Sequence, residues 1–113
     1  MRKTLLFIAF GLAACGPSFP APRDQYAAAE KDVGRAQESG ASVPDARLHT
    51  QLAQEDLAKA KALMGGDNER AASLIARASA EADLAINLAR QSQAQSQAQQ
   101  GNEALNKVKA GGQ

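Results

Sequence analysis

The sequence predicts an all-α protein, folded as an antiparallel helical hairpin or a small three-helix bundle. Two observations support this fold class. Apolar residues recur three and four positions apart through three segments of the chain, which is the spacing of one face of a helix. Glycine, proline, serine and aspartate, which favour helix ends, cluster between these segments.

The first predicted helix begins at Pro22 and ends at Gly40. Its apolar stripe consists of Tyr26, Ala29, Val33 and Ala36. Gly34 lies inside this helix and costs about 1 kcal/mol relative to alanine. Gly40 is placed to end the helix, because glycine readily adopts the conformation that follows a last helical turn.

The second predicted helix begins near Ser42, whose side chain is suited to cap early backbone N–H groups. Asp45 stands three residues later, in a position that resembles a capping box, and Pro44 suits a first turn. One broad apolar face follows, made of Leu48, Leu52, Ala53, Leu57, Ala60, Leu63 and Met64.

Charged residues interrupt this second helix. Asp56 lies inside the apolar arc and Lys59 at its edge, so both are expected at the rim of the packed surface. Glu55 and Lys59 are four residues apart with the acid first, and their pairing is worth about 0.2–0.5 kcal/mol. His49 is the only histidine in the sequence and has no second ligand near it, which favours a boundary position in the helix over a metal or catalytic role.

The third predicted helix begins after Gly65-Gly66-Asp67, with Asp67 as N-cap and Glu69 in the first turn. Its apolar side consists of Ala71, Leu74, Ile75, Ala78, Ala82, Ala85, Ile86 and Ala89. So short a connection makes the second and third helices an antiparallel hairpin. The predicted helical domain covers residues 23–90. In residues 91–113, rich in Gln, Ser and Ala, the helix can continue as an exposed rod, and disorder is expected beyond Gly101.

The N-terminus has the features of an export signal. Arg2 and Lys3 precede an apolar run that is too short to cross a bilayer, which needs about 20 residues. The following Leu12-Ala13-Ala14-Cys15 resembles the bacterial lipobox. That resemblance implies removal of residues 1–14 and covalent lipid on Cys15, with residues 15–22 as a proline-rich tether. The same resemblance implies a location, because an aspartate after the cysteine favours retention in the inner membrane in many bacteria with this motif. Gly16 at this position therefore implies the periplasmic face of the outer membrane.

The composition argues against several classes of function. Without residues 1–14 the chain keeps 11 of its 13 basic residues against 12 acidic ones, a formal net charge of −1 that does not favour nucleic acid. No combination of residues predicts a catalytic or metal site, because the sequence lacks a nucleophile elbow, a phosphate-binding loop and metal-ligand spacing. No cofactor is expected beyond the lipid on Cys15.

The segment GASVPDARLHTQLAQEDLAKAKALMGGDNERAASLIARASAEADLA resembles the helical-hairpin module called domain of unknown function 4398. The shared features are a proline-started helix, a Gly-Asp turn and an alanine-rich second helix. The resemblance implies a bacterial lipoprotein and assigns no catalytic residue. This chain has Asn68 where the family often has an aromatic residue.

The predicted function is that of a lipid-anchored, non-enzymatic structural or protein-interaction module of the cell envelope. Leu84 and Leu88 form a second small stripe on the third helix and are the candidate interaction face, for a protein partner or a second copy. The alternative explanation of the apolar faces is that tight packing between alanines stabilises the bundle without any partner. Two other functions stay open: an accessory subunit of an envelope transport or secretion complex, and a carrier of a small apolar ligand.

Overall fold

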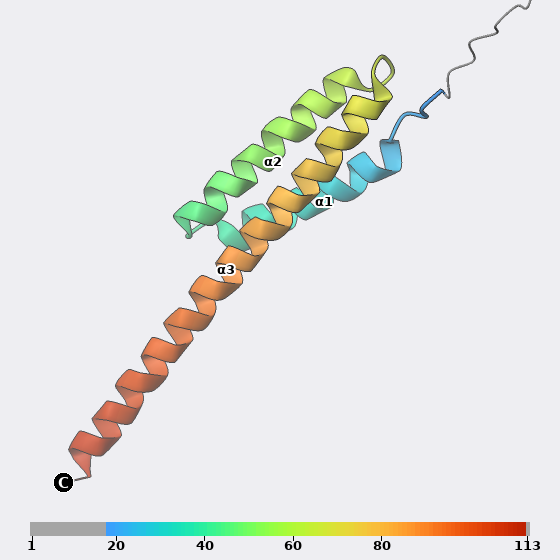
Figure 1. Ribbon diagram of the computed structural model, residues 1–113. Coiled ribbons are helices and arrows are strands. Elements are labelled where there is room, and N and C mark those ends of the chain that lie inside the picture. The colour runs from blue at the N-terminus through green and yellow to red at the C-terminus, as the bar shows by residue number, and fades with distance from the viewer. Residues whose placement is uncertain (1–17, 113) are drawn as a thin grey trace, which may run out of the picture.

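The computed structural model describes residues 18–112, which form three helices (Figure 1). Helix α1 spans Arg23–Gly40, α2 spans Pro44–Leu63 and α3 spans Asn68–Gly111. The all-α prediction is confirmed, and of its two forms the three-helix bundle is the one adopted. The predicted signal peptide, residues 1–14, and the lipobox residues Leu12, Ala13, Ala14 and Cys15 lie outside the described residues.

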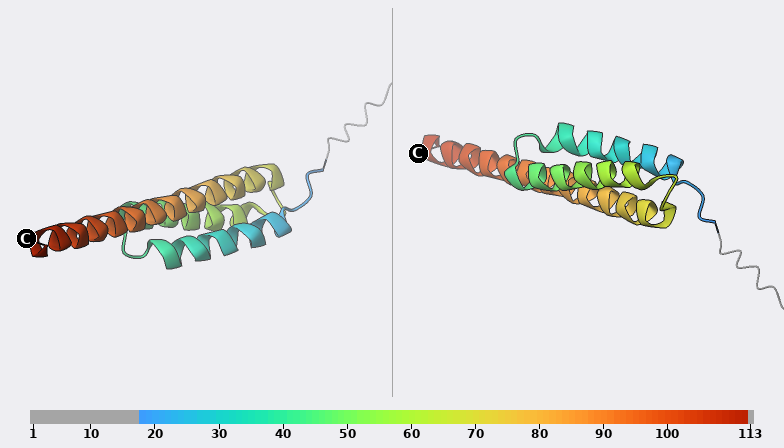
Figure 2. Two further views of the ribbon diagram at one scale, coloured as in Figure 1. Left: turned by 90° about the horizontal axis from the view of Figure 1, so that it is seen from below. Right: turned by 90° about the horizontal axis from the view of Figure 1, so that it is seen from above.

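The three helices pack side by side over the length of α1 and α2, and α3 then continues alone (Figures 1 and 2). Helices α2 and α3 run antiparallel, joined by the short turn at residues 64–67, and α1 packs against both. At 1.5 Å per residue the 44 residues of α3 extend about 66 Å. Residues 91–111 account for about 31 Å of that length.

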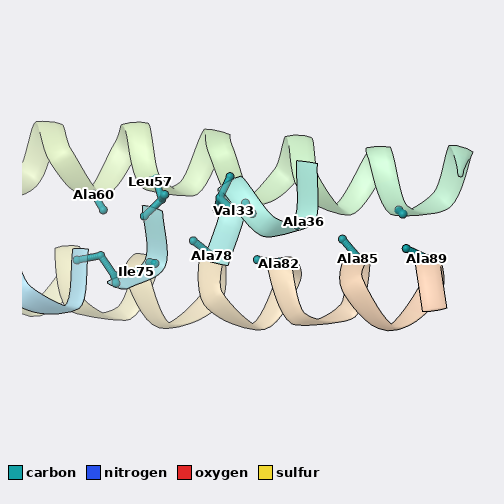
Figure 3. Close-up of a cluster of buried hydrophobic side chains, with 12 residues drawn as sticks. Val33, Ala36, Leu57, Ala60, Ile75, Ala78, Ala82, Ala85 and Ala89 are labelled. Atoms are coloured by element: carbon teal, nitrogen blue, oxygen red, sulfur yellow. The ribbon is translucent and has the colours of Figure 1, made fainter. Parts of the chain in front are cut away.

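The core of the bundle consists mostly of alanine (Figure 3). Its larger members are Val33 from α1, Leu57 from α2 and Ile75 from α3. On α3 the buried residues follow one another at alternating intervals of four and three: Ala71, Ile75, Ala78, Ala82, Ala85 and Ala89. This is the spacing of a coiled-coil seam, and methyl-sized side chains along it allow the helix axes to approach closely.

The connection between α1 and α2 depends on a close contact more than on capping. A Cβ atom at Gly40 would lie 2.8 Å from Cβ of Ala46, so only glycine fits where α1 ends against α2. The predicted cap at Ser42 is wrong: Val43 is the N-cap residue and no side chain caps the helix. Pro44 occupies the first turn as predicted.

The turn between α2 and α3 agrees with the sequence prediction. Gly65 has a φ of 93°, a conformation that glycine adopts without the penalty a Cβ atom would impose. The Asp67 side chain caps α3 by accepting a hydrogen bond from the backbone N–H of Arg70, at 3.1 Å. Glycine and aspartate therefore act here through local backbone chemistry that is readable from sequence.

The C-terminal segment differs from its prediction. Disorder was expected beyond Gly101, whereas α3 continues to Gly111. Most residues of this segment are glutamine, alanine, lysine and other good helix formers, and the bundle supplies the helical nucleus from which the segment extends. From Gln93 to Gly112 every residue is exposed, so this extension of α3 makes no packing contact that buries a side chain.

Candidate interaction surface

Two ion pairs join α2 to α3 along one side of the hairpin. His49 Nδ1 lies 2.6 Å from Glu81 Oε2, and both side chains are about a quarter exposed. Asp56 receives two hydrogen bonds from the Arg77 guanidinium, through Nε and Nη2. The two pairs occur in opposite order along the two helices, as an antiparallel hairpin requires.

The buried carboxylate of Asp56 corrects the prediction of a rim position. Asp56 is 3% exposed, and the bidentate contact with Arg77 compensates its charge. That contact is also the main reason why the pKa of Arg77 is raised above its ordinary value: the hydrogen bond to Asp56 contributes most, then the negative charge of Asp56. Because Asp56 is buried, its contact with the largely exposed Arg77 fixes the register of the two helices: moving either helix leaves the carboxylate unpaired.

His49 and Lys59 also differ from their predicted surroundings. His49 occupies the expected boundary position but has a partner, Glu81, that the sequence did not reveal. The predicted pair of Glu55 with Lys59 is not among the ion pairs of the described residues, and Glu55 instead accepts a hydrogen bond from Gln51 at 3.3 Å.

Large apolar side chains lie beside these ion pairs on the outside of the bundle. Leu48 is 55% exposed, Leu52 37% and Leu84 42%. Leu48 and Leu52 were predicted to belong to the packed face of the second helix, and that prediction is wrong. We call the set Leu48, Leu52, Leu84 and Leu88 the leucine face.

The leucine face lies on the side of the hairpin that α1 leaves uncovered. The Gln54 side chain reaches Gln37 of α1 at 3.5 Å, and Leu52, two residues earlier, points about 160° away around α2. On α3, Leu84 and Leu88 follow Arg77 and Glu81 at intervals of three and four residues. They therefore continue the side of α3 that carries the ion pairs.

The candidate face predicted on the third helix is thus only partly exposed. Leu84 is open to solvent, whereas Leu88 is half-buried and packs against the core. The leucines of α2 that complete this surface were missed. The missing signal was the position of α1, which determines the side of the hairpin that is covered.

This surface presents exposed leucine side chains beside the pairs His49–Glu81 and Asp56–Arg77. The described residues contain no group of three or more His, Cys, Asp or Glu side chains placed to hold a metal ion. Within residues 18–112, no helix is long and apolar enough to cross a bilayer. Hollows between the helices, such as the one lined by Tyr26, Val33 and Leu57, are open to solvent.

Comparison with known proteins assigns the family. The model of the family described as a domain of unknown function (DUF4398) matches residues 24–100, from the first turn of α1 into the extension of α3. The chain belongs to this DUF4398 family. The match covers all of α2 and most of α1 and α3, so the three-helix bundle is the family's part of this chain. No curated protein and no solved structure matches the chain.

Proposed function

We propose that this DUF4398 protein is a lipid-anchored, non-enzymatic module of the bacterial cell envelope, attached through Cys15 to the periplasmic face of the outer membrane. The sequence Leu12-Ala13-Ala14-Cys15 after a short apolar run supports the anchor. One acyl chain gives only reversible binding, and the two or more chains of a bacterial lipoprotein give stable attachment. The task of the folded part is to present helical surfaces to proteins near the membrane.

The observation that carries this proposal is the link between the N-terminal segment and the α2–α3 turn. The Asn68 side chain donates a hydrogen bond to the backbone carbonyl of Phe19 and accepts one from the backbone N–H of Gly65, both at 2.7 Å. Phe19 is therefore held at the end of the bundle where α3 begins. Cys15 is four residues away, a separation of at most about 14 Å.

With this arrangement, a lipid on Cys15 would lie at the opposite end of the molecule from the free helix. The α3 extension leaves the bundle at the end remote from Phe19 and ends about 66 Å along α3 from the Asn68 link. Its exposed residues include Leu105 and Val108, 51% and 72% exposed. A small protein anchored at one end and carrying an uncovered helix at the other suits an interaction role better than catalysis. An accessory subunit of an envelope complex is the second candidate, which the same uncovered helix favours.

The first experiment is the intact mass of the protein extracted from membranes, with a Cys15→Ser control. The expected mass lacks residues 1–14 and includes lipid, and the control variant carries none. An unlipidated mass, or the same mass increment in the control, would overturn the anchor.

A second experiment tests the position of the anchor. Single cysteines replace Glu69 at the start of α3 or Lys107 near its end, each is labelled with a fluorophore, and the lipidated protein is reconstituted into vesicles with a quencher in the lipid headgroups. The label at position 69 should be quenched more than the label at position 107. Equal quenching, or stronger quenching at position 107, would contradict the arrangement.

A further inference from the structure

The distribution of apolar side chains in this bundle is unusual for a protein that functions as a single copy. Alanine forms most of the core, whereas Leu48, Leu52 and Leu84 lie outside with 37–55% of their surface exposed. Leucine is normally among the residues most often buried, and isolated exposed leucines need no explanation. Three exposed leucines on two adjoining helices form a patch of the kind that marks an interaction site.

The ion pairs hold this patch in place. His49 adjoins Leu48, and its partner Glu81 is three residues before Leu84, so the pair brings the leucines of both helices to the same end of the hairpin. Leu48, Leu52 and Leu84 of the leucine face stay exposed because α1 packs on the other side of the hairpin. The leucine face is therefore preformed on two helices that are packed against each other.

The charges on either side of Leu52 on α2 favour a second copy of this chain as the binding partner. Asp45, Leu52 and Lys59 are spaced by seven residues, so they lie along one line on α2, with Leu52 in the middle. Asp45 and Lys59 are both exposed, and neither forms an ion pair with another described residue. A twofold axis through Leu52 places Asp45 of each copy opposite Lys59 of the other, at about 10 Å on either side of the axis.

We propose that the leucine face binds a second copy of this chain, with the two α2 helices antiparallel and Leu52 at the twofold axis. A parallel arrangement would instead set Asp45 against Asp45 and Lys59 against Lys59, with like charges opposed twice. The proposal stands on the bundle itself and does not depend on the lipid anchor. Where both hold, an antiparallel dimer carries one anchor at each end and lies along the bilayer, so the expected difference in quenching between positions 69 and 107 applies to the monomer, at a low ratio of protein to lipid.

Disulfide crosslinking tests the position of the axis. In a chain carrying Cys15→Ser, an introduced cysteine is the only thiol. Leu52→Cys should give a disulfide-linked dimer under mild oxidation, because the two Cβ atoms meet at the axis. Gln51→Cys is the matched control: this neighbour is also exposed but points about 100° away, so it should form no disulfide-linked dimer under the same oxidation. Equal crosslinking of both variants, or none at position 52, would overturn the proposal.

Sedimentation equilibrium tests the orientation, again with Cys15→Ser. The chain should form dimers, Asp45→Lys should weaken them at least several-fold, and the double variant Asp45→Lys/Lys59→Asp should restore them. Circular dichroism of each variant verifies that the bundle stays folded. A chain that stays monomeric up to about 1 mM contradicts the proposal, as does a dimer that Asp45→Lys leaves unchanged.

Discussion

Replacing Gly40 by alanine is expected to destabilise the bundle by forcing α1 away from α2. The new Cβ atom would lie 2.8 Å from Cβ of Ala46, about 1 Å inside the ordinary carbon–carbon contact distance. Ala46 is fully buried and its Cβ cannot rotate away, so the backbones must separate. Overpacking of this kind typically costs about 1–3 kcal/mol.

The helix propensity of alanine offsets part of this cost. The gain is at most about 1 kcal/mol and is smaller at Gly40, the last residue of α1. The net loss in the free energy of unfolding should therefore be about 1–2 kcal/mol. For a domain of this size, each kcal/mol lowers the melting temperature by roughly 4–8 °C.

Gly34→Ala is the matched control on the same helix. A Cβ atom at Gly34 has no neighbour within 4 Å, so only the propensity term applies, and the variant should gain about 0.5–1 kcal/mol. Both variants are compared with the parent by thermal and urea denaturation, followed by circular dichroism at 222 nm. If Gly40→Ala were as stable as Gly34→Ala, the close approach of α1 to α2 would be refuted.

Three further predictions concern the ion pair, the single tyrosine and the α3 extension. Asp56→Leu should lower the urea midpoint less than Arg77→Ala, because the first removes the buried charge and the second leaves it unpaired; the reverse order would contradict a buried carboxylate. Burial raises the pKa of Tyr26 above 10.0, and the charge of Glu30 and its hydrogen bond raise it further. The absorbance titration of Tyr26 should therefore have a higher midpoint in the folded protein than in urea. Glu30→Gln should lower the midpoint of the folded protein. The folded state then retains the phenolic proton more strongly, and stability should fall as the pH rises above 10. Gly101→Ala should increase helicity at 222 nm, since its Cβ meets nothing within 4 Å; no increase would indicate that α3 ends before residue 101.

The elements of this fold could be predicted where the cause is local. Pro44 in a first turn, Gly65 in the turn between α2 and α3 and Asp67 as N-cap act within a few residues of themselves, and the structure has each in that role. The 3.6-residue periodicity likewise predicted all three helices. The continuation of α3 past Gly101 was missed because polar composition was interpreted as disorder, whereas a helix already nucleated needs only good helix formers to extend.

The candidate surface was predicted less well, because it depends on how the helices pack. The broad apolar arc of α2 includes both Leu52 and Leu57, and only the position of α1 decides that Leu57 is buried while Leu52 is exposed. The pairs His49–Glu81 and Asp56–Arg77 depend on the register of α2 against α3, which no single segment encodes. The useful signal was Asp56 itself: a carboxylate inside an apolar arc needs a partner across the interface.

The bundle and the proposed dimer use different residues, and this separation has a consequence that mutations can reveal. Alanines along the α3 seam, such as Ala82, are fully buried, and a larger side chain there must force the helices apart. Leu52 and Leu84 contribute little to the core, so polar replacements there should leave the melting temperature of dilute protein nearly unchanged while abolishing association. In a protein that buried its leucines and exposed its alanines, the same replacements would lower folding and association together. Mutations that lower stability and mutations that lower association should therefore fall on different residues, as expected when one surface of the folded bundle binds a second copy.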